Sequence, residues 1–562
     1  MHLVLTLHSH LPYVLNHGRW PHGSDWLCEA AVDTYLPLLE ALNHLDEKGT
    51  PSPVTLGVTP VLANQLSSPG FAEELEGFFQ QRLRACDEAP TSLAETGEGD
   101  LLPLVGFWRG RFLRLRKAFQ EMGGDLIGSF RRHRDEGRLE FITSAATHGF
   151  LPLLGREESI RLQLAVGVRE HERLLGSTPR GCWVPECAYR PGGNWNPIPG
   201  VSAERERPGL ERHLSEAGFR FFFLDTHMAE AGGSLGWYGD VPHGAQRFDA
   251  DFLGEARDPD WKASRSPYQA YLVGEGGEEH ELAAFVREPR ASMQVWSRHA
   301  GYPGDSAYLE FHKIRWPGGL KLWRVTGPDA GLGEKAPYDP GKAGYRASDH
   351  ATHFSGFLGH IQRKERVGPS GVAMIPFDTE LFGHWWFEGI DFLRELFTRL
   401  PFRDGVVPVT ATEHLEAFPP QVAIQPLEGS WGAQGDFGMW LNESTRWTWE
   451  RLWSLEDLFW DTAPGGLSAE DTRTIVAHAA RQLLLAQSSD WQFMISTGAV
   501  PDYATRRFNL HCDDADLLLG ALQPGAPPEA MSRALERVAE LQSRDDLFPD
   551  ILQSVEAVLN RS

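Results

Sequence analysis

The stretch GCWVPECAYR, from Gly181 to Arg190, joins a short apolar run to an acidic side chain. The run ends at Pro185, Glu186 follows directly, and aromatic side chains stand on either side at Trp183 and Tyr189. A strand that ends on a carboxylate is a place where chemistry can occur. Taken alone, Glu186 is more simply a surface loop acid, because catalytic acids are a minority of all acids. Its interpretation depends on what other strands place beside it.

Six further short apolar runs resemble the one that precedes Glu186, and most of them lack the alternation of polar and apolar residues that a half-exposed strand shows. Such runs are typical of strands buried on both faces, as in a parallel sheet covered by helices. Helical patterns fall between several of them, for example at residues 157–176 and 208–218. Repetition of strand and helix predicts a parallel α/β fold. The expected strands lie within residues 3–7, 54–60, 139–149, 181–186, 219–227, 292–297 and 371–380.

Polar and aromatic side chains stand at or just beyond the carboxyl ends of these runs. In a (β/α) barrel, that end is where active sites are built. Contributions from so many strands converge more naturally at a barrel mouth than along an open sheet, so we expect a closed barrel. The side chains at these ends are His8, His10, His148, Glu186, Asp225, His227, Trp296 and Asp378.

Two interruptions and a change of composition divide the chain. Residues 71–135 contain two helical patterns separated by the acidic, flexible-looking DEAPTSLAETGEGD, and we expect an inserted helical subdomain there. Residues 229–290 are rich in Gly, charges and aromatics, and we expect them to form a loop region over the barrel mouth, since loops of this length are usually functional. The sequence thus predicts a catalytic barrel in residues 1–418 and an all-helical domain in residues 419–562.

The composition limits the partners and the compartment. The chain has 562 residues and a formal net charge of −24, which argues against nucleic acid or an anionic membrane as a partner, because both need a basic surface. Neither a long apolar stretch nor a basic-then-apolar N-terminus is present, so we expect no membrane span, no signal peptide and a cytoplasmic protein. The five cysteines form no C-x-x-C pair and are expected to be free thiols.

A second carboxylate, Asp378 in IPFDTELFGHWWFEG, complements Glu186. Two carboxylates at the ends of different barrel strands are the minimum for glycosidic bond chemistry, in which one attacks the anomeric carbon and the other protonates the leaving oxygen. A retaining enzyme needs them about 5 Å apart. Glu380 is a rival to Asp378, and Asp378 taken alone is as easily a salt-bridged or capping acid.

Five histidines at strand ends allow two interpretations. A His-x-His at the end of the first strand is a known way to place two imidazoles on one metal ion. Alternatively, the imidazoles hydrogen-bond sugar hydroxyls and the nucleophile. The pattern alone leaves both open for His8, His10, His148, His227 and His384.

Nineteen tryptophans against eleven tyrosines favour exposed aromatic platforms, on which pyranose rings can stack. Trp431 stands out because it lies in the Gly-rich EGSWGAQGDFG, where little side-chain bulk surrounds it. A tryptophan of the helical region is as easily a core residue as a platform. The candidates are Trp20, Trp296, Trp385, Trp386, Trp431, Trp440 and Trp491.

Taken together, these stretches resemble glycoside hydrolase family 57, and within it the 1,4-α-glucan branching enzymes. The similar segments follow in order along the chain: HSHLPYV at His8, ATHGF at Ala146, WVPECAY at Trp183, FDTELFGHWW at Phe377 and the Trp-rich segment near Trp431. Members share a (β/α)7 barrel with an inserted helical subdomain and a C-terminal helical domain. They retain the anomeric configuration and need no metal for catalysis.

The resemblance implies that Glu186 is the nucleophile and Asp378 the general acid/base. It implies an α-1,4-glucan as donor and acceptor, with transfer of the cleaved chain to a 6-hydroxyl as an α-1,6 branch. We expect no cofactor and a monomer or small homo-oligomer. Tyr238 is the candidate for the tip of a catalytic loop. The implied substrate-binding residues are His8, His10, Trp20, His148, Asp225, His227, Tyr238, Trp296, His384, Trp385, Trp431, Trp440, Asp490 and Trp491.

Three alternatives stay open. An α-amylase or 4-α-glucanotransferase of the same family would use the same two carboxylates. A metal-dependent deacetylase or amidohydrolase would use the histidines. A catalytically silent glucan-binding protein is the third, and the co-occurrence of Glu186 and Asp378 argues against it.

Overall fold

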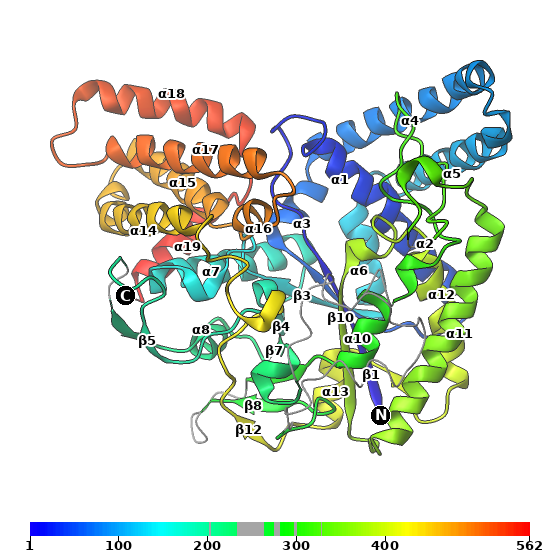
Figure 1. The fold of residues 1–562 in the computed structure, drawn as a ribbon. Helices are drawn as coiled ribbons and strands as arrows, with labels where there is room; N and C mark the ends of the chain where they lie inside the picture. The colour runs from blue at the N-terminus through cyan, green and yellow to red at the C-terminus, as the bar shows by residue number, and fades with distance from the viewer. Residues whose placement is uncertain (202–203, 233–263, 275–281, 297–300, 328, 562) are drawn as a thin grey trace.

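A computed structural model describes residues 1–201, 204–232, 264–274, 282–296, 301–327 and 329–561 (Figure 1). Parallel strands form its centre, in the order β10, β1, β2, β3, β4, β7, β9. Every residue of β2, β7 and β9 is buried, which explains why these strands are continuous apolar runs. The bounds are β1 His2–Ser9, β2 Val54–Val58, β3 Leu139–Ser144, β4 Gly181–Trp183, β7 Phe221–Leu224, β9 Ala283–Val286 and β10 Val372–Asp378.

The two outer parallel strands meet at one point and close the barrel. Arg287, directly after β9, forms a parallel bridge with Met374 of β10. The backbone N–H of Glu288 donates to the Met374 carbonyl at 2.7 Å. The short strands β8 (Tyr271–Val273) and β12 (Ala423–Ile424) extend the sheet beyond β9. The seven-stranded α/β barrel predicted from the sequence is confirmed.

Helices follow most strands and cover the outside of the barrel (Figure 1). In the connection from β3 to β4, for example, the main helix buries one face, begins with two acids and ends before Gly176, which has the left-handed conformation. The covering helices are α2 Leu36–Glu47, α3 Pro60–Leu66, α6 Leu126–Asp135, α7 Glu157–Leu175, α8 Leu210–Glu216, α11 Pro340–Lys364, α12 Gly389–Arg399 and α13 Ala411–Ala417.

One predicted strand is wrong. A strand is expected near residues 292–297, but residues 289–296 form the helix α10 (Pro289–Trp296). The sixth barrel strand is β9, which begins nine residues before the expected one. Pro289 suits the first turn of a helix, and the Glu288 carboxylate accepts the Ala291 N–H at 2.5 Å, which satisfies a donor at the start of that helix. The region expected to be loop therefore holds β8 and β9. Residues 233–263 and 275–281, with Tyr238, lie outside the described residues.

The helical insertion is present, but its predicted flexible segment is mostly helix. α4 (Pro69–Thr96) runs through most of DEAPTSLAETGEGD and contains Pro90. It continues because its apolar face, which includes Phe79 and Leu93, packs against α5 (Leu102–Glu121). Gly97, with φ 71°, ends the helix.

The C-terminal region is helical from Arg446 onward and lies on the opposite side of the molecule from α4 and α5 (Figure 1), whereas β12, within the region predicted to be all-helical, belongs to the barrel sheet. Its central helix, α15, is buried from Ile475 to Ala486 and packs against α14 and α17. None of the described helices is long and apolar enough to cross a membrane. All five cysteines are buried free thiols, as expected. The helices are α14 Arg446–Gly466, α15 Glu470–Ala486, α16 Asp490–Thr497, α17 Pro501–Gly520, α18 Pro528–Arg544 and α19 Ile551–Leu559.

Candidate active site

Glu186 follows β4 in a tight turn and has a left-handed backbone, with φ 61° and ψ 21°. A non-glycine residue in this region costs about 1–3 kcal/mol and persists only where its surroundings hold it. Here the C-terminal region does so. Trp431 donates from its indole Nε1 to Glu186 Oε2 at 2.8 Å and from its backbone N–H to the Glu186 carbonyl at 3.0 Å. Ser489 donates from its hydroxyl to Glu186 Oε1 at 3.2 Å.

Asp378 is the last residue of β10 and lies beside His8 in the register of the sheet. Because β4 and β10 are not neighbours in the barrel, Glu186 and Asp378 approach from different sides of its mouth. Burial raises the pKa of Glu186 to about 7, and the charge of Asp378 contributes to this rise. Burial, with the charge of Glu380, raises the pKa of Asp378 to about 8. The fold thus brings two carboxyl groups with raised pKa values within electrostatic reach of each other.

Glu380, the rival acid, is engaged elsewhere. Its Oε1 accepts a hydrogen bond from the hydroxyl of Tyr35, the last residue of the π-helical turn Ala31–Tyr35 that joins α1 (Ser24–Ala30) to α2. Burial raises the pKa of Glu380 to about 7. Since a structural partner already holds this carboxyl group, Asp378 is the better candidate for the reacting acid.

Three histidines form a stack next to Glu186. The rings of His10 and His148 lie 4.0 Å apart, and His8 stacks on Trp183 at 4.8 Å. The Nε2 atoms of His8 and His148 are 3.0 Å apart, and His148 Nδ1 lies 2.9 Å from the Ser489 hydroxyl and 3.7 Å from Glu186 Oε1. Burial lowers the pKa of both His8 and His148 well below the ordinary value, so these two imidazoles are neutral.

The third ring, His10, links the barrel to the C-terminal region. Its Nε2 lies 2.9 Å from Asp490 Oδ2, and its Nδ1 lies 3.0 Å from the Thr59 hydroxyl. Potential ligand atoms of His10, His148 and Asp490 all lie within 4.8 Å of one another, a spacing that a metal ion could use. The same atoms are satisfied by hydrogen bonds to one another and to neighbouring side chains. The geometry is therefore compatible both with histidines that bind a metal ion and with histidines that hydrogen-bond sugar hydroxyls and the nucleophile.

Two family models match the chain. Residues 4–425 match glycosyl hydrolase family 57, and residues 460–555 match the C-terminal domain of 1,4-alpha-glucan branching enzymes. The chain belongs to glycosyl hydrolase family 57. A 1,4-alpha-glucan branching enzyme from Thermococcus kodakarensis is 38% identical to it over 98% of this chain and 78% of that protein.

Solved structures agree with this assignment. The crystal structure of the Thermococcus enzyme superposes on this family 57 member with a TM-score of 0.87 at 36% identity, covering 99% of this chain and 96% of that one. The alpha-amylase AmyC from Thermotoga maritima superposes with a TM-score of 0.78 at 26% identity, covering 98% of both chains. The shared fold thus includes proteins named for transfer and for hydrolysis.

Arg287 is a site residue of this family 57 protein that the sequence did not indicate. Its guanidinium lies 3.9 Å from Asp225 Oδ1, 5.7 Å from the centre of the Trp431 ring and 6.0 Å from that of Trp296. Its charge also lowers the pKa of Asp378, against the larger effect of burial. Correct placement of the sixth strand would have revealed Arg287, because it follows β9 directly. The position of Ser489 in the sequence, in contrast, does not follow a barrel strand and so does not indicate that it contacts Glu186.

The remaining candidate residues lie in two places: Asp225 and His227 lie near the loop that carries Trp431, whereas His384 lies near Thr34 and Phe311. Asp225 is buried after β7, and His227 Nε2 donates to the Gly435 carbonyl at 2.8 Å, in the same glycine-rich loop as Trp431. His384 contacts a different group: its backbone N–H donates to Thr34 at 3.1 Å and its ring packs against Phe311. Burial lowers the pKa of His384 to about 4.

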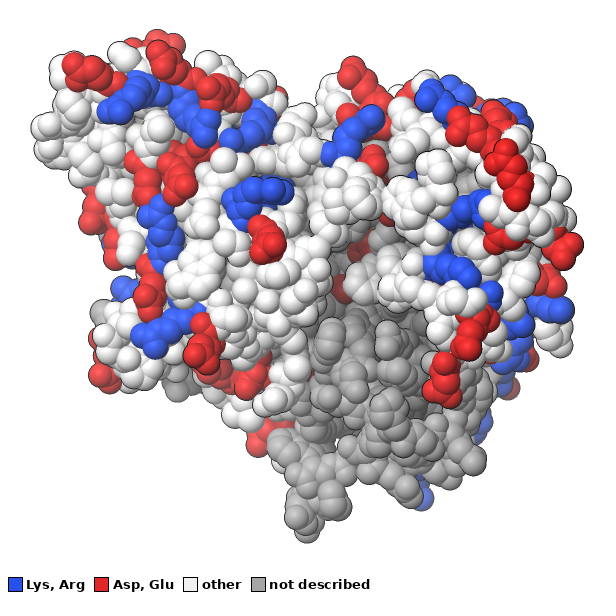
Figure 2. Space-filling view, turned by 45° about the horizontal axis from the view of Figure 1, so that its top comes forward, with Lys and Arg blue, Asp and Glu red and all other residues white. Residues whose placement is uncertain are grey.

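The candidate tryptophans include both exposed and buried side chains. Trp431 is partly exposed and meets the rings of Trp183 and Trp296 edge to face. The platform interpretation is corrected for Trp440 and Trp491, which are 1% and 0% exposed and belong to the core of the helical region. Trp386 and Trp296 are also buried, whereas Trp20 and Trp385 are exposed. Figure 2 shows a hollow between the C-terminal helices and the α4–α5 side, with mostly uncharged residues along its inner walls.

Proposed function

We propose that this chain is a retaining 1,4-α-glucan branching enzyme. The observation that carries the proposal is the pair formed by Glu186 and Asp378, which combine raised pKa values with positions at one barrel mouth. The similarity to a branching enzyme over nearly the whole chain supports the same reading. The substrate is a neutral α-1,4-glucan, which a chain with a net charge of −24 does not repel.

In the first step, the ionised Glu186 attacks the anomeric carbon of an internal α-1,4 linkage. The C1–O4 bond breaks, and protonated Asp378 gives its proton to the leaving oxygen. The hydrogen bonds from Trp431 and Ser489 fix both oxygens of Glu186, so that the carboxylate is aimed before the substrate arrives. The product of this step is a glycosyl ester on Glu186.

In the second step, Asp378 accepts the proton of a 6-hydroxyl on an acceptor glucan while that oxygen attacks the anomeric carbon. The ester bond breaks, Glu186 is released as a carboxylate, and an α-1,6 branch forms. Two inversions at one carbon give retention of configuration. The outcome depends on whether sugar or water reaches the intermediate, so exposed aromatics around the mouth influence the ratio of transfer to hydrolysis.

The test is incubation with amylose, followed by linkage analysis and by debranching with chain-length analysis. New α-1,6 linkages are expected. Glu186→Gln and Asp378→Asn should each lower the initial rate by about 10²–10⁴-fold or more, whereas exposed Glu416→Gln serves as the matched control. Near-wild-type rates in either site variant would remove its assigned role.

An α-amylase is the second candidate, favoured by the structural likeness to AmyC. Linear products without new α-1,6 linkages would establish it instead. Retained activity after exhaustive chelation would eliminate the metal-dependent hydrolase that the His10, His148 and Asp490 spacing allows. We further place the reaction in glycogen-type polysaccharide synthesis in the cytoplasm, by a monomer or small homo-oligomer, which cell fractionation and sedimentation would test.

A further inference from the structure

Among the residues that the structure describes, three tryptophans expose more than half of their surface, which is unusual for so large an apolar side chain. Trp20 is 65% exposed, Trp316 is 55% exposed and Trp385 is 58% exposed. Two of them already belong to the proposed substrate-binding set. Trp316 does not: neither the sequence patterns nor the steps of the proposed reaction account for it.

Ring contacts hold these exposed side chains in two pairs, which the chain segment from Phe311 to Trp316 connects. Trp316 meets Trp20 edge to face, with ring centres 5.2 Å apart and planes at 87°, so the pair is not stacked face on face. Five residues before Trp316 in the same loop, Phe311 lies parallel to Trp385, with ring centres 6.3 Å apart. We call these four residues, Trp385, Phe311, Trp316 and Trp20, the aromatic track.

The aromatic track begins close to the candidate active site in the chain. Trp385 stands seven residues after Asp378, in the loop that follows β10. Trp20 lies in the loop that follows β1, the strand that ends near His8 and His10. The track therefore joins two loops that both leave the barrel mouth and extends from them toward the α4–α5 insertion.

The loop that carries Trp316 is held firmly against this insertion. Arg315 Nη1 lies 2.6 Å from Glu98 Oε2, and the Arg315 N–H donates to the Leu320 carbonyl at 2.8 Å. Arg82 of α4 donates to the Gly318 carbonyl, and Trp108 of α5 donates to the Lys321 carbonyl at 2.5 Å. A loop fixed in this way loses little conformational entropy when a ligand binds to the ring it carries.

The chemistry of the track fits a neutral sugar polymer. Indole faces bind the C–H faces of pyranose rings, whereas a strongly acidic chain disfavours an anionic partner. We propose that Trp316, with Trp20, binds a glucose segment of the α-glucan at a distance from the bond that is cleaved. This inference rests on the proposed function and extends its binding surface. Its consequence is a preference for long chains, because only a chain that occupies the catalytic site and Trp316 together gains the additional contact.

The first test is native gel electrophoresis in the presence and absence of amylose. Trp316→Ala and Trp20→Ala should each weaken retardation by amylose about two- to tenfold, the range expected for the loss of one aromatic contact. Trp316→Phe should restore most of the retardation. Tyr345→Ala is the matched control, because Tyr345 is 73% exposed and outside the track. Equal retardation of Trp316→Ala and wild type would overturn the inference.

Kinetics provide an independent readout. In Trp316→Ala, the KM for amylose should rise about two- to tenfold relative to the KM for maltohexaose. An unchanged ratio would overturn the inference even if the protein branches amylose. Conversely, loss of retardation in a protein that forms no α-1,6 linkages would support the track while refuting the proposed function. If sedimentation showed that Trp316→Ala breaks a dimer without altering amylose binding, the occupant would be a second copy and the inference would fail.

Discussion

At the scale of single residues, the candidate site collects ionisable groups whose burial opposes their charge. Glu186, Asp378 and Glu380 all have raised pKa values, with burial as the largest cause in each. The imidazole of His148 and the indole of Trp431 lie beside the Glu186 carboxylate, and burial is the largest influence on its pKa. Such an arrangement costs stability and suits acid–base chemistry near neutral pH.

The pH dependence of branching follows from the two carboxyl groups. The proposed reaction requires Glu186 to be ionised and Asp378 to be protonated. With pKa values of about 7 and about 8, the rate should rise through pH 7, reach a maximum between the two and fall above pH 8. Initial rates of α-1,6 linkage formation from pH 5 to 10 measure this profile. A rate that stays flat across that range would contradict it.

The same shift predicts how Asp378→Asn changes stability. The folded-state pKa of Asp378, about 8, lies above the ordinary value for Asp, so the folded state holds a proton that the unfolded state releases. The contribution of Asp378 to stability therefore falls as pH rises from about 4 to 8. Asparagine cannot ionise, so the variant should gain a few °C in Tm over wild type at pH 9 and much less at pH 5. Calorimetry at both values, with exposed Asp404→Asn as control, measures the difference; an equal offset at both would refute it.

At the scale of elements, the loop after β1 is fastened to the C-terminal helices by buried polar contacts. Arg507 of α17 donates to the Tyr13 carbonyl at 2.7 Å, and His17 Nε2 lies 2.7 Å from Asp545 Oδ1. Asp545, directly after α18, is fully buried and also accepts from Gln482 of α15 at 2.8 Å. The root of this loop carries His8 and His10, so its anchoring helps to position the stack.

Removal of Asp545 tests this anchor. Although burial opposes it, hydrogen bonds from His17 and Arg544 hold the pKa of Asp545 well below its ordinary value. The stabilisation is therefore present above the unfolded-state pKa of about 4 and is lost as pH falls. Asp545→Ala should lose about 3–5 kcal/mol at pH 7, because buried partners are left unpaired. Its deficit should shrink once the pH falls below about 4, which urea unfolding at pH 7 and at about pH 3 would reveal. A deficit that grows with acid would contradict the argument. Asp546→Ala, at the exposed next residue, is the control.

The strands and helices also show which parts of the fold and of the candidate site the sequence could predict. Apolar runs located six of the seven barrel strands, and strand ends located Glu186, Asp378 and the histidines. The sixth strand is misplaced because AAFV offers only four residues, whereas SMQVW, which also carries apolar side chains, lies in the helix α10. Periodicity over so few residues does not separate strand from helix. Burial of Trp440 and Trp491 was equally hidden, because it depends on neighbours far away in the chain.

At the scale of the whole molecule, the C-terminal region completes the candidate site. Trp431, Ser489 and Asp490 come from beyond the barrel, yet they contact Glu186 or His10. Glu186 and Ser489 are 303 residues apart, a pairing that no local pattern predicts. The left-handed backbone at Glu186 is held by the same contacts, so the geometry of this carboxylate depends on both parts of the chain.

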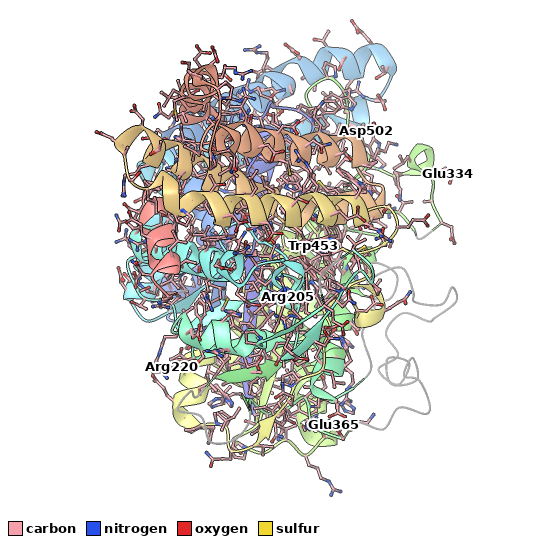
Figure 3. All side chains as sticks on the ribbon, turned by 90° about the vertical axis from the view of Figure 1, so that its left-hand side faces the viewer. Arg205, Arg220, Glu334, Glu365, Trp453 and Asp502 are labelled. Atoms are coloured by element: carbon pink, nitrogen blue, oxygen red, sulfur yellow. The ribbon has the colours of Figure 1, made fainter. Side chains whose placement is uncertain are left out.

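This dependence predicts that the barrel and the C-terminal helices unfold together. Buried hydrogen bonds cross the boundary: Trp453, labelled in Figure 3, donates to the Leu153 carbonyl at 2.8 Å, and Gln163 donates to Gln487 at 2.9 Å. Glu456 of α14 is fully buried, where it accepts the Gly155 N–H at 2.6 Å and the Gln487 side chain at 2.7 Å. Since these bonds are lost if either part opens, thermal unfolding should be one cooperative transition.

Glu456→Ala should lower the stability of the whole chain by about 2–4 kcal/mol, because it leaves buried donors without an acceptor. Calorimetry should still show one transition, shifted to lower temperature, and branching activity should disappear across the same interval. Glu450→Ala on the same helix, where the side chain is partly exposed and, among the described residues, pairs only with Arg446 of that helix, is the matched control. Two resolved transitions, with only the first affected by the substitution, would mean that the helices fold as a separate unit. The Glu186 contacts would then be a docking of two independent parts, and activity would be lost while the barrel remained folded.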